Sequence, residues 1–101
     1  MVIKIGGEID LYSSPQLRKT ILESIKAKPL AILIDLENVR YMDSSGVATL
    51  IEGLKRANQY QGRFAIAGLR AEVKEVFELT RLDKVFEIYY DSETALETMA
   101  A

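Results

Sequence analysis

The sequence predicts an α/β protein with a four- to five-stranded, mostly parallel (mixed) sheet packed with about four helices. Short runs of aliphatic and β-branched residues alternate with segments whose apolar residues recur at helical spacing. The connections between these segments are short. The 101 residues have the size of one domain, and an apolar fraction of 49% provides a sizeable core. We therefore expect residues 1–101 to form a single domain.

The first predicted strand begins the chain. Val2–Ile5 start it, Gly6-Gly7 permit a bulge, and Ile9 and Leu11 continue the alternation of apolar residues. A helix is predicted from Ser13-Ser14-Pro15, because serine caps helices and proline is favoured in their first turn.

The middle of the chain predicts a buried strand between two helices. The first helix has apolar residues at helical spacing and is ended by Pro29. The strand covers the aliphatic run Leu30–Leu36. The second helix begins beside Asp43 and ends near Gly62, where we expect a left-handed cap. Its apolar face consists of Val47, Leu50, Ile51 and Leu54.

The remainder predicts two further strands and two further helices. Arg63–Gly68 is a strand, and Val73–Thr80 has the spacing of a helix. After a connection at Leu82–Lys84, the strand Val85–Tyr90 places Phe86, Ile88 and Tyr90 on one face. A terminal helix starts at Asp91-Ser92-Glu93.

Composition excludes several classes of function. The formal net charge is −2, so no basic surface is expected to bind nucleic acid directly. The chain has no Cys and no His, which removes disulfides, thiol nucleophiles and the commonest base and metal ligand. No apolar run approaches the roughly 20 residues that span a membrane. We expect a cytoplasmic protein without a cofactor, a metal or a membrane contact.

The most informative segment is Tyr41–Val47, where a strand passes into a helix. Asp43 or Ser44 suits the N-cap position, and Gly46 allows close packing of the helix start. Helix initiation needs only one cap, so the second hydroxyl, on Ser45, is not explained by capping. A hydroxyl at a helix start can act as a cap, a nucleophile, an anion ligand or a phosphorylation acceptor.

Catalysis fits this segment poorly. A nucleophile elbow requires glycine two residues before and after the serine, but Asp43 and Val47 flank Ser45 at those positions. No His is present to act as the base. An aspartyl phosphoacceptor would need an acidic pair to hold Mg²⁺. Glu8 and Asp10 are better explained as solvent-facing carboxylates near a loop, and Asp35 lies inside an apolar run. The remaining interpretation is a serine modified by another protein. A phosphate beside Asp43 would repel a docked partner and leave the fold intact.

The chain resembles the STAS-domain anti-sigma factor antagonists of bacteria, the phosphorylatable proteins of partner-switching systems. The resemblance covers essentially the whole chain and is carried by four segments in order. They are Gly7-Glu8-Ile9-Asp10, Ile34-Asp35-Leu36 leading to Tyr41-Met42-Asp43-Ser44-Ser45-Gly46, Leu79–Phe86, and Glu93-Thr94-Ala95-Leu96. The fold implied is a single STAS domain over residues 1–101.

The resemblance also implies a function. The unphosphorylated protein would bind an anti-sigma factor that is a serine kinase, and thereby release a sigma factor that regulates transcription. The kinase would phosphorylate Ser45 and end the complex, and a PPM-type serine phosphatase would reverse the modification. The implied partner-binding residues are Asp10, Asp43, Ser44, Ser45 and Gly46, with Tyr12, Ser13 and Ser14 as weaker candidates. Strand end and helix cap explain Tyr12, Ser13 and Ser14 about equally well.

Two other functions stay open from the sequence. One is a non-catalytic STAS accessory subunit of a larger assembly, such as a lipid-transport complex or a stress-signalling scaffold. The other is a small enzyme with Ser45 or Asp43 as its nucleophile. Family members usually carry a further strand before Gly7-Glu8-Ile9-Asp10, so Val2–Ile5 is expected to form an exposed edge that supports a weak homodimer.

Overall fold

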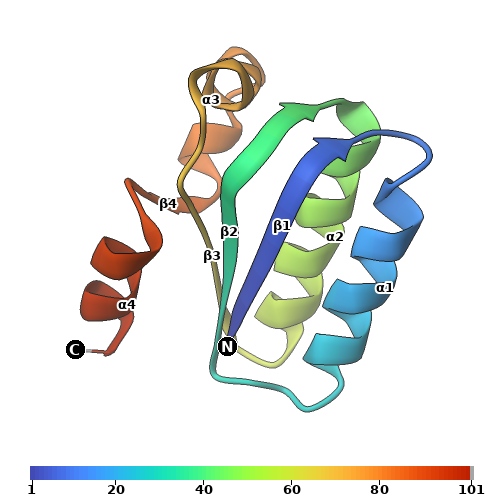
Figure 1. Ribbon diagram of the computed structural model, residues 1–101. Helices are drawn as coiled ribbons and strands as arrows, with labels where there is room; N and C mark the ends of the chain where they lie inside the picture. Colours follow the sequence, from blue (N-terminus) through green and yellow to red (C-terminus); the bar gives the residue numbers. More distant parts are fainter. Residues whose placement is uncertain (101) are drawn as a thin grey trace.

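The computed structural model describes residues 1–100 and alternates strands with helices (Figure 1). The elements are β1 (Val2–Ile9), α1 (Ser14–Ile25), β2 (Ala31–Met42), α2 (Ser44–Gln59), β3 (Arg63–Ala67), α3 (Ala71–Leu79), the 3₁₀ helix η1 (Leu82–Lys84), β4 (Glu87–Tyr89) and α4 (Ser92–Ala100).

The four strands form one sheet in the order β1-β2-β3-β4, and each neighbouring pair is parallel. The predicted α/β architecture is confirmed. Within residues 1–100 the sheet has no fifth strand and no antiparallel pair, so the mixed form that the sequence allowed is not adopted. Leu11, which was expected to continue a strand, lies in the turn after β1 with 70% of its surface exposed.

The helices cover the two faces of the sheet unequally. Ile32 and Ile34 pack in a core cluster that also contains residues of α1, α2 and α3. Leu33 and Ala65 point to the opposite face, where they pack against Ala95 of α4. In Figure 1, α1 and α2 lie to the right of the sheet and α4 lies to its left. Alternate side chains of the central strands are therefore buried on both faces, which explains their continuous apolar sequence.

β2 is longer than predicted, because it continues past Leu36 to Met42. Val39 and Met42 are buried, and they pair with Gly7 and Ile9 of β1. The register shifts twice along this pair, and each time β2 contributes one residue more than β1. The predicted bulge is thus present, with its extra residues on β2. This extension delivers Asp43 to the carboxyl edge of the sheet.

The end of α2 differs from the prediction. The left-handed residue is Gln61, with φ of 64°, and not Gly62. Gly62 lies against the ring of Tyr60, and a Cβ added there would be 2.4 Å from the Tyr60 Cε1 atom. The glycine is required for space at this position, so its lack of a side chain serves packing and not backbone conformation.

Asp35, which lies inside an apolar run of the sequence, is buried in β2 with 6% of its surface exposed. One carboxylate oxygen accepts a hydrogen bond from the Ser92 hydroxyl at 2.6 Å, and the other accepts from the Glu37 backbone N–H at 3.0 Å. Because Ser92 is the first residue of α4, this acid attaches the helix to the centre of the sheet.

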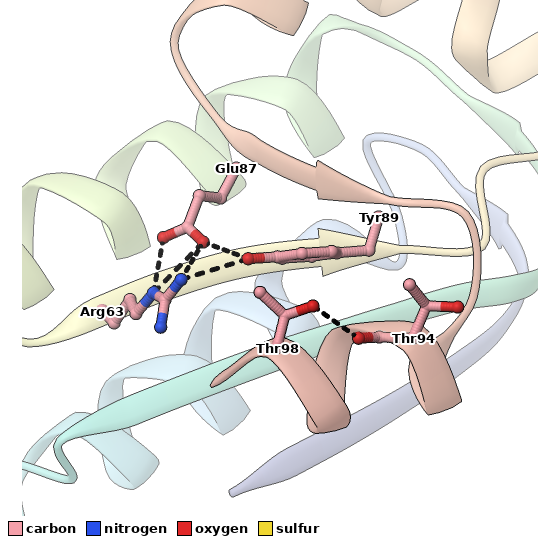
Figure 2. Close-up of polar contacts among 5 residues, drawn as sticks. All are labelled: Arg63, Glu87, Tyr89, Thr94 and Thr98. Carbon is pink, nitrogen blue, oxygen red and sulfur yellow. Dashed lines mark hydrogen bonds and ion pairs between the residues drawn. The ribbon is translucent and has the colours of Figure 1, made fainter. Parts of the chain in front are cut away.

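A polar cluster joins β3 to β4 (Figure 2). The Arg63 guanidinium donates to both carboxylate oxygens of Glu87, at 2.8 and 2.7 Å, and the Tyr89 hydroxyl donates to Glu87 at 2.5 Å. The hydrogen bond from Arg63 lowers the pKa of Glu87. Figure 2 shows the three side chains pointing toward one another, with Thr94 and Thr98 of α4 on the same side. The cluster adds side-chain hydrogen bonds to the backbone pairing of β3 with β4.

Tyr60→Phe is expected to stabilise the protein by about 1 kcal/mol. The Tyr60 hydroxyl is buried and has no hydrogen-bond partner within residues 1–100, so its removal eliminates an uncompensated desolvation cost. Urea denaturation measures the change. The control is Tyr12→Phe, because Tyr12 is 92% exposed and should be neutral. A less stable Tyr60→Phe protein would contradict this account.

Candidate functional site

The junction of β2 and α2 lies beside the end of β1, at the carboxyl edge of the sheet. The backbone N–H of Asp43 donates to the carbonyl oxygen of Ile9 at 3.0 Å. This bond holds the turn after β1 next to the start of α2. The two segments predicted from the sequence to form one surface, around Asp10 and around Ser45, are therefore neighbours in space.

Asp43 is the N-cap of α2. Its Oδ1 atom accepts hydrogen bonds from the backbone N–H of Ser45 at 2.9 Å and, more weakly, from that of Gly46 at 3.4 Å. The Asp43 carbonyl oxygen accepts from the Val47 N–H at 3.1 Å. The sequence allows either Asp43 or Ser44 as the N-cap, and in the structure the N-cap is Asp43. Its carboxylate satisfies backbone N–H groups that have no partner within the first helical turn.

The Ser45 hydroxyl is held by the same carboxylate, since it donates to Asp43 Oδ1 at 2.5 Å. Ser45 is half-buried and Ser44 is exposed. The Ser45 carbonyl oxygen also accepts from the Thr49 hydroxyl at 2.9 Å. The Ser45 side chain thus has a defined orientation at the protein surface, with its oxygen beside a negative charge.

The pKa of Asp43 is lowered, chiefly by the hydrogen bond from the Ser45 hydroxyl. Backbone N–H groups of Gly46, Ser45 and Leu11 lower it further, and partial burial opposes them. Asp43 is therefore ionised at neutral pH. Any second negative charge placed on Ser45 would lie against an existing one.

Asp43→Asn is expected to destabilise the protein at neutral pH and to have no effect in strong acid. Folding favours the ionised form of the Asp43 carboxylate, because the pKa of this group is lower in the folded protein. The stabilising effect of the carboxylate is therefore present above the ordinary pKa of aspartate. It is lost as the pH falls through the lowered pKa. Thermal denaturation of both proteins between about pH 7 and about pH 2 measures the difference. A stability difference independent of pH would contradict the role of the charge.

The residues after β1 form a compact turn around Asp10. Its Oδ1 atom accepts from the backbone N–H groups of Tyr12 at 2.9 Å and Ser13 at 3.0 Å. The Ser13 hydroxyl donates to the Glu8 carbonyl oxygen at 2.8 Å and accepts from the Asp10 N–H at 2.9 Å. Ser13 occupies the N-cap position of α1 without capping it, so the predicted serine cap is wrong.

The predicted site residues differ in what they present to solvent. Tyr12 and Ser44 are exposed, whereas Asp10, Ser13, Asp43 and Ser45 are partly exposed. Gly46 is buried, and its α-carbon packs between Ile9 and Met42. A partner can therefore reach little of Gly46. Ser14 is also buried, with 7% of its surface exposed, which favours its structural explanation.

Two exposed apolar residues at this edge were missed by the sequence reasoning. Leu11 is 70% exposed beside Tyr12, and Tyr41 is 52% exposed at the end of β2. The sequence predicts Leu11 as a residue that continues the apolar alternation of the first strand, and it gives no separate role to Tyr41 at the start of the segment Tyr41–Val47. Both residues are identified by the solvent exposure of their side chains, which is known only from the folded structure.

The arrangement limits the chemistry available. Within residues 1–100, no group of three or more Asp, Glu, His or Cys side chains is placed to hold a metal ion. In the same part of the chain, no helix has both the length and the apolar character required to cross a membrane. The distinctive feature is a surface hydroxyl held by an ionised carboxylate at a helix start.

Comparison with known proteins identifies the fold and its relatives. The family model described as STAS domain matches residues 1–95. An anti-sigma-B factor antagonist of Staphylococcus aureus is 32% identical over 91 residues, which cover 90% of this chain and 84% of that protein. The crystal structure of an anti-sigma factor antagonist from Mycobacterium paratuberculosis superposes with a TM-score of 0.91 at 28% identity, covering 99% of this chain and 85% of that one.

Proteins of lower sequence identity share this fold. A sulfate transporter family protein from Wolinella succinogenes superposes with a TM-score of 0.84 at 14% identity, covering 96% of this chain and 81% of that one. At this level of identity the similarity concerns the fold alone.

Proposed function

Because the chain belongs to the STAS domain family, we propose that it is an anti-sigma factor antagonist controlled by phosphorylation. In this proposal the unphosphorylated form binds an anti-sigma factor with serine kinase activity and frees a sigma factor. Phosphorylation of Ser45 ends the interaction, and a PPM-type serine phosphatase restores it. The similarity to the Staphylococcus aureus anti-sigma-B factor antagonist supports the first step. The protein acts by binding, and we place it in the cytoplasm of a bacterium.

The observation that supports control by phosphorylation is the hydrogen bond from the Ser45 hydroxyl to the Asp43 carboxylate. Phosphorylation replaces the hydroxyl proton that Asp43 accepts and adds a group of about −1.5 to −2 charges. The new charge lies beside the Asp43 carboxylate, at the positive end of α2. The helix start tolerates the phosphate, whereas a partner packed over this edge would meet two adjacent negative charges.

The surface around Ser45 has the composition of a protein-binding site. Leu11, Tyr12 and Tyr41 expose 70, 92 and 52% of their surfaces at the same edge of the sheet. Exposed aromatic side chains often supply a large part of the binding free energy in protein interfaces. We therefore define the docking surface as Leu11, Tyr12, Tyr41, Ser44 and Ser45. Asp10, Ser13 and Asp43 hold the two turns of this surface through their hydrogen bonds.

A pull-down from lysate of the source organism tests the function. Wild type is compared with Ser45→Asp, and captured proteins are identified by mass spectrometry. Asn58→Asp is the matched control, because it adds the same charge at the exposed opposite end of α2. An ATP-binding kinase captured by wild type and Asn58→Asp, and lost by Ser45→Asp, would support the proposal. Equal capture of membrane or scaffold proteins by all three would favour an accessory subunit of a larger assembly.

We also propose that the chain of residues 1–101 self-associates weakly through β1. β1 pairs with β2 on one side, and no strand within residues 1–100 pairs with its other side. An unpaired strand edge can bind a second strand through its free backbone groups. Static light scattering is expected to give an apparent mass that rises above that of a monomer with concentration. A monomeric mass at high concentration would contradict this proposal.

A further inference from the structure

A second surface feature lies at the end of the domain opposite to Ser45. A cleft of about 470 Å³ opens between the C-terminal ends of α1 and α2. Leu22 and Ile25 of α1 and the side chain of Tyr60 supply its apolar wall. Its volume lies within the range of sites that bind small molecules, and Lys26, Lys28, Arg56 and Gln59 complete its lining.

Cationic side chains surround this cleft. Lys26 and Lys28 line it and are exposed, and within residues 1–100 neither forms an ion pair with a carboxylate. Arg56 also lines it and contacts Glu52 at 3.3 Å, but Glu52 is engaged more closely by Arg18 at 2.7 Å. The cleft is therefore a positive region on a chain whose net charge is −2.

Helix capping explains part of this arrangement. Cations near a helix C-terminus interact favourably with the helix dipole and with its free carbonyl groups. Capping accounts for the charges of Lys26 and Arg56, but it does not require an apolar cavity between the two helices. The combination of an apolar wall with a cationic rim matches a molecule that has an apolar body and an anionic head.

We propose that this cleft binds a free organic anion with an alkyl or acyl chain and a carboxylate or phosphate head. The chain lies along Leu22, Ile25 and Tyr60, and the head lies between the cations of the rim, where charge-assisted hydrogen bonds form. Gln59 of the cleft wall follows Ser45 by 14 residues of α2, which corresponds to about 21 Å along the helix axis. The site is separate from the docking surface, so both can be occupied together.

The test uses dodecanoate as the probe, added below its micelle concentration to the ¹⁵N-labelled chain. Amide shifts are followed by NMR, and dodecyltrimethylammonium, which has the same chain and the opposite charge, is the control ligand. Saturable shifts centred on Leu22, Ile25 and Tyr60 with dodecanoate alone support the proposal. Equal shifts with both ligands, or shifts scattered over the domain, would overturn it. Binding to phosphatidylglycerol vesicles without any effect of dodecanoate would also overturn it.

Reversing the charges of two lysines in the cleft provides a second test of the proposed site. The double variant Lys26→Glu/Lys28→Glu is expected to weaken dodecanoate binding about tenfold, because each exposed charge contributes modestly. The double variant Lys19→Glu/Lys55→Glu changes the net charge equally at exposed positions outside the cleft, and it should bind as wild type does. Equal affinity in the two double variants would refute the role of the rim.

Discussion

Ser45→Asp is expected to fold as the wild type does and to bind its partner at least about a hundredfold more weakly, since like charges brought together in an interface cost several kcal/mol. The aspartate places a permanent negative charge beside Asp43, which already accepts the Ser45 hydroxyl at 2.5 Å. A carboxylate near a helix N-terminus is compatible with the fold. Calorimetric titration with the purified partner measures the loss, and circular dichroism checks the fold.

Ser45→Ala is the complementary variant. It removes the hydroxyl but leaves the Asp43 cap on the backbone N–H of residue 45, so binding is expected to persist. After incubation with the kinase and ATP, this variant should keep its partner and incorporate no phosphate. Ser44→Ala is the control and should still be phosphorylated and released. Phosphate on Ser45→Ala, or binding by Ser45→Asp equal to wild type, would disprove the switch at Ser45.

Gly46→Val is expected to destabilise the protein by about 3 kcal/mol or more, at the upper end for overpacked positions. A Cβ at residue 46 would lie 2.7 Å from the Ile9 Cγ2 atom and 2.7 Å from the Met42 Cγ atom. Both neighbours are buried, with 2 and 3% of their surfaces exposed, so neither can move aside cheaply. The start of α2 would have to shift away from β1 and β2.

The shift caused by Gly46→Val also predicts weaker partner binding, because it displaces Ser45 and the turn after β1. Differential scanning calorimetry should show a melting temperature lower by more than about 10 °C. Gly6→Ala is the matched control, since a Cβ there meets the Asn38 Cβ at an ordinary 3.5 Å. An unchanged melting temperature with unchanged affinity for Gly46→Val would refute the packing role of this glycine.

The elements that the sequence predicted well are those in which local pattern and tertiary packing agree. The helical spacing of Val47 and Leu50 marks the buried face of α2, and both residues are buried. The errors occur at element ends. Met42 belongs to β2 because it pairs with Ile9, and that pairing depends on residues more than 30 positions apart.

The candidate site was predicted in part. Asp43 as a cap follows from local chemistry, because a short acidic side chain before a helix reaches its first N–H groups. The burial of Gly46 and the exposure of Leu11 and Tyr41 could not be predicted in this way. They depend on where β1 ends relative to β2, which the two register shifts decide.

The sequence by itself determined the α/β class, the order of its elements and the absence of histidine and cysteine chemistry, because periodicity and composition are local properties of the chain. Only the tertiary structure decided which face each helix covers, that Asp35 is buried against Ser92, and that Gln61 and not Gly62 is left-handed. It also decided that the turn at Asp10 lies beside Ser45. Apart from the left-handed Gln61, which belongs to a local turn, these features arise from contacts between segments distant in sequence. Burial and hydrogen bonding of such segments are set only when the whole core has formed.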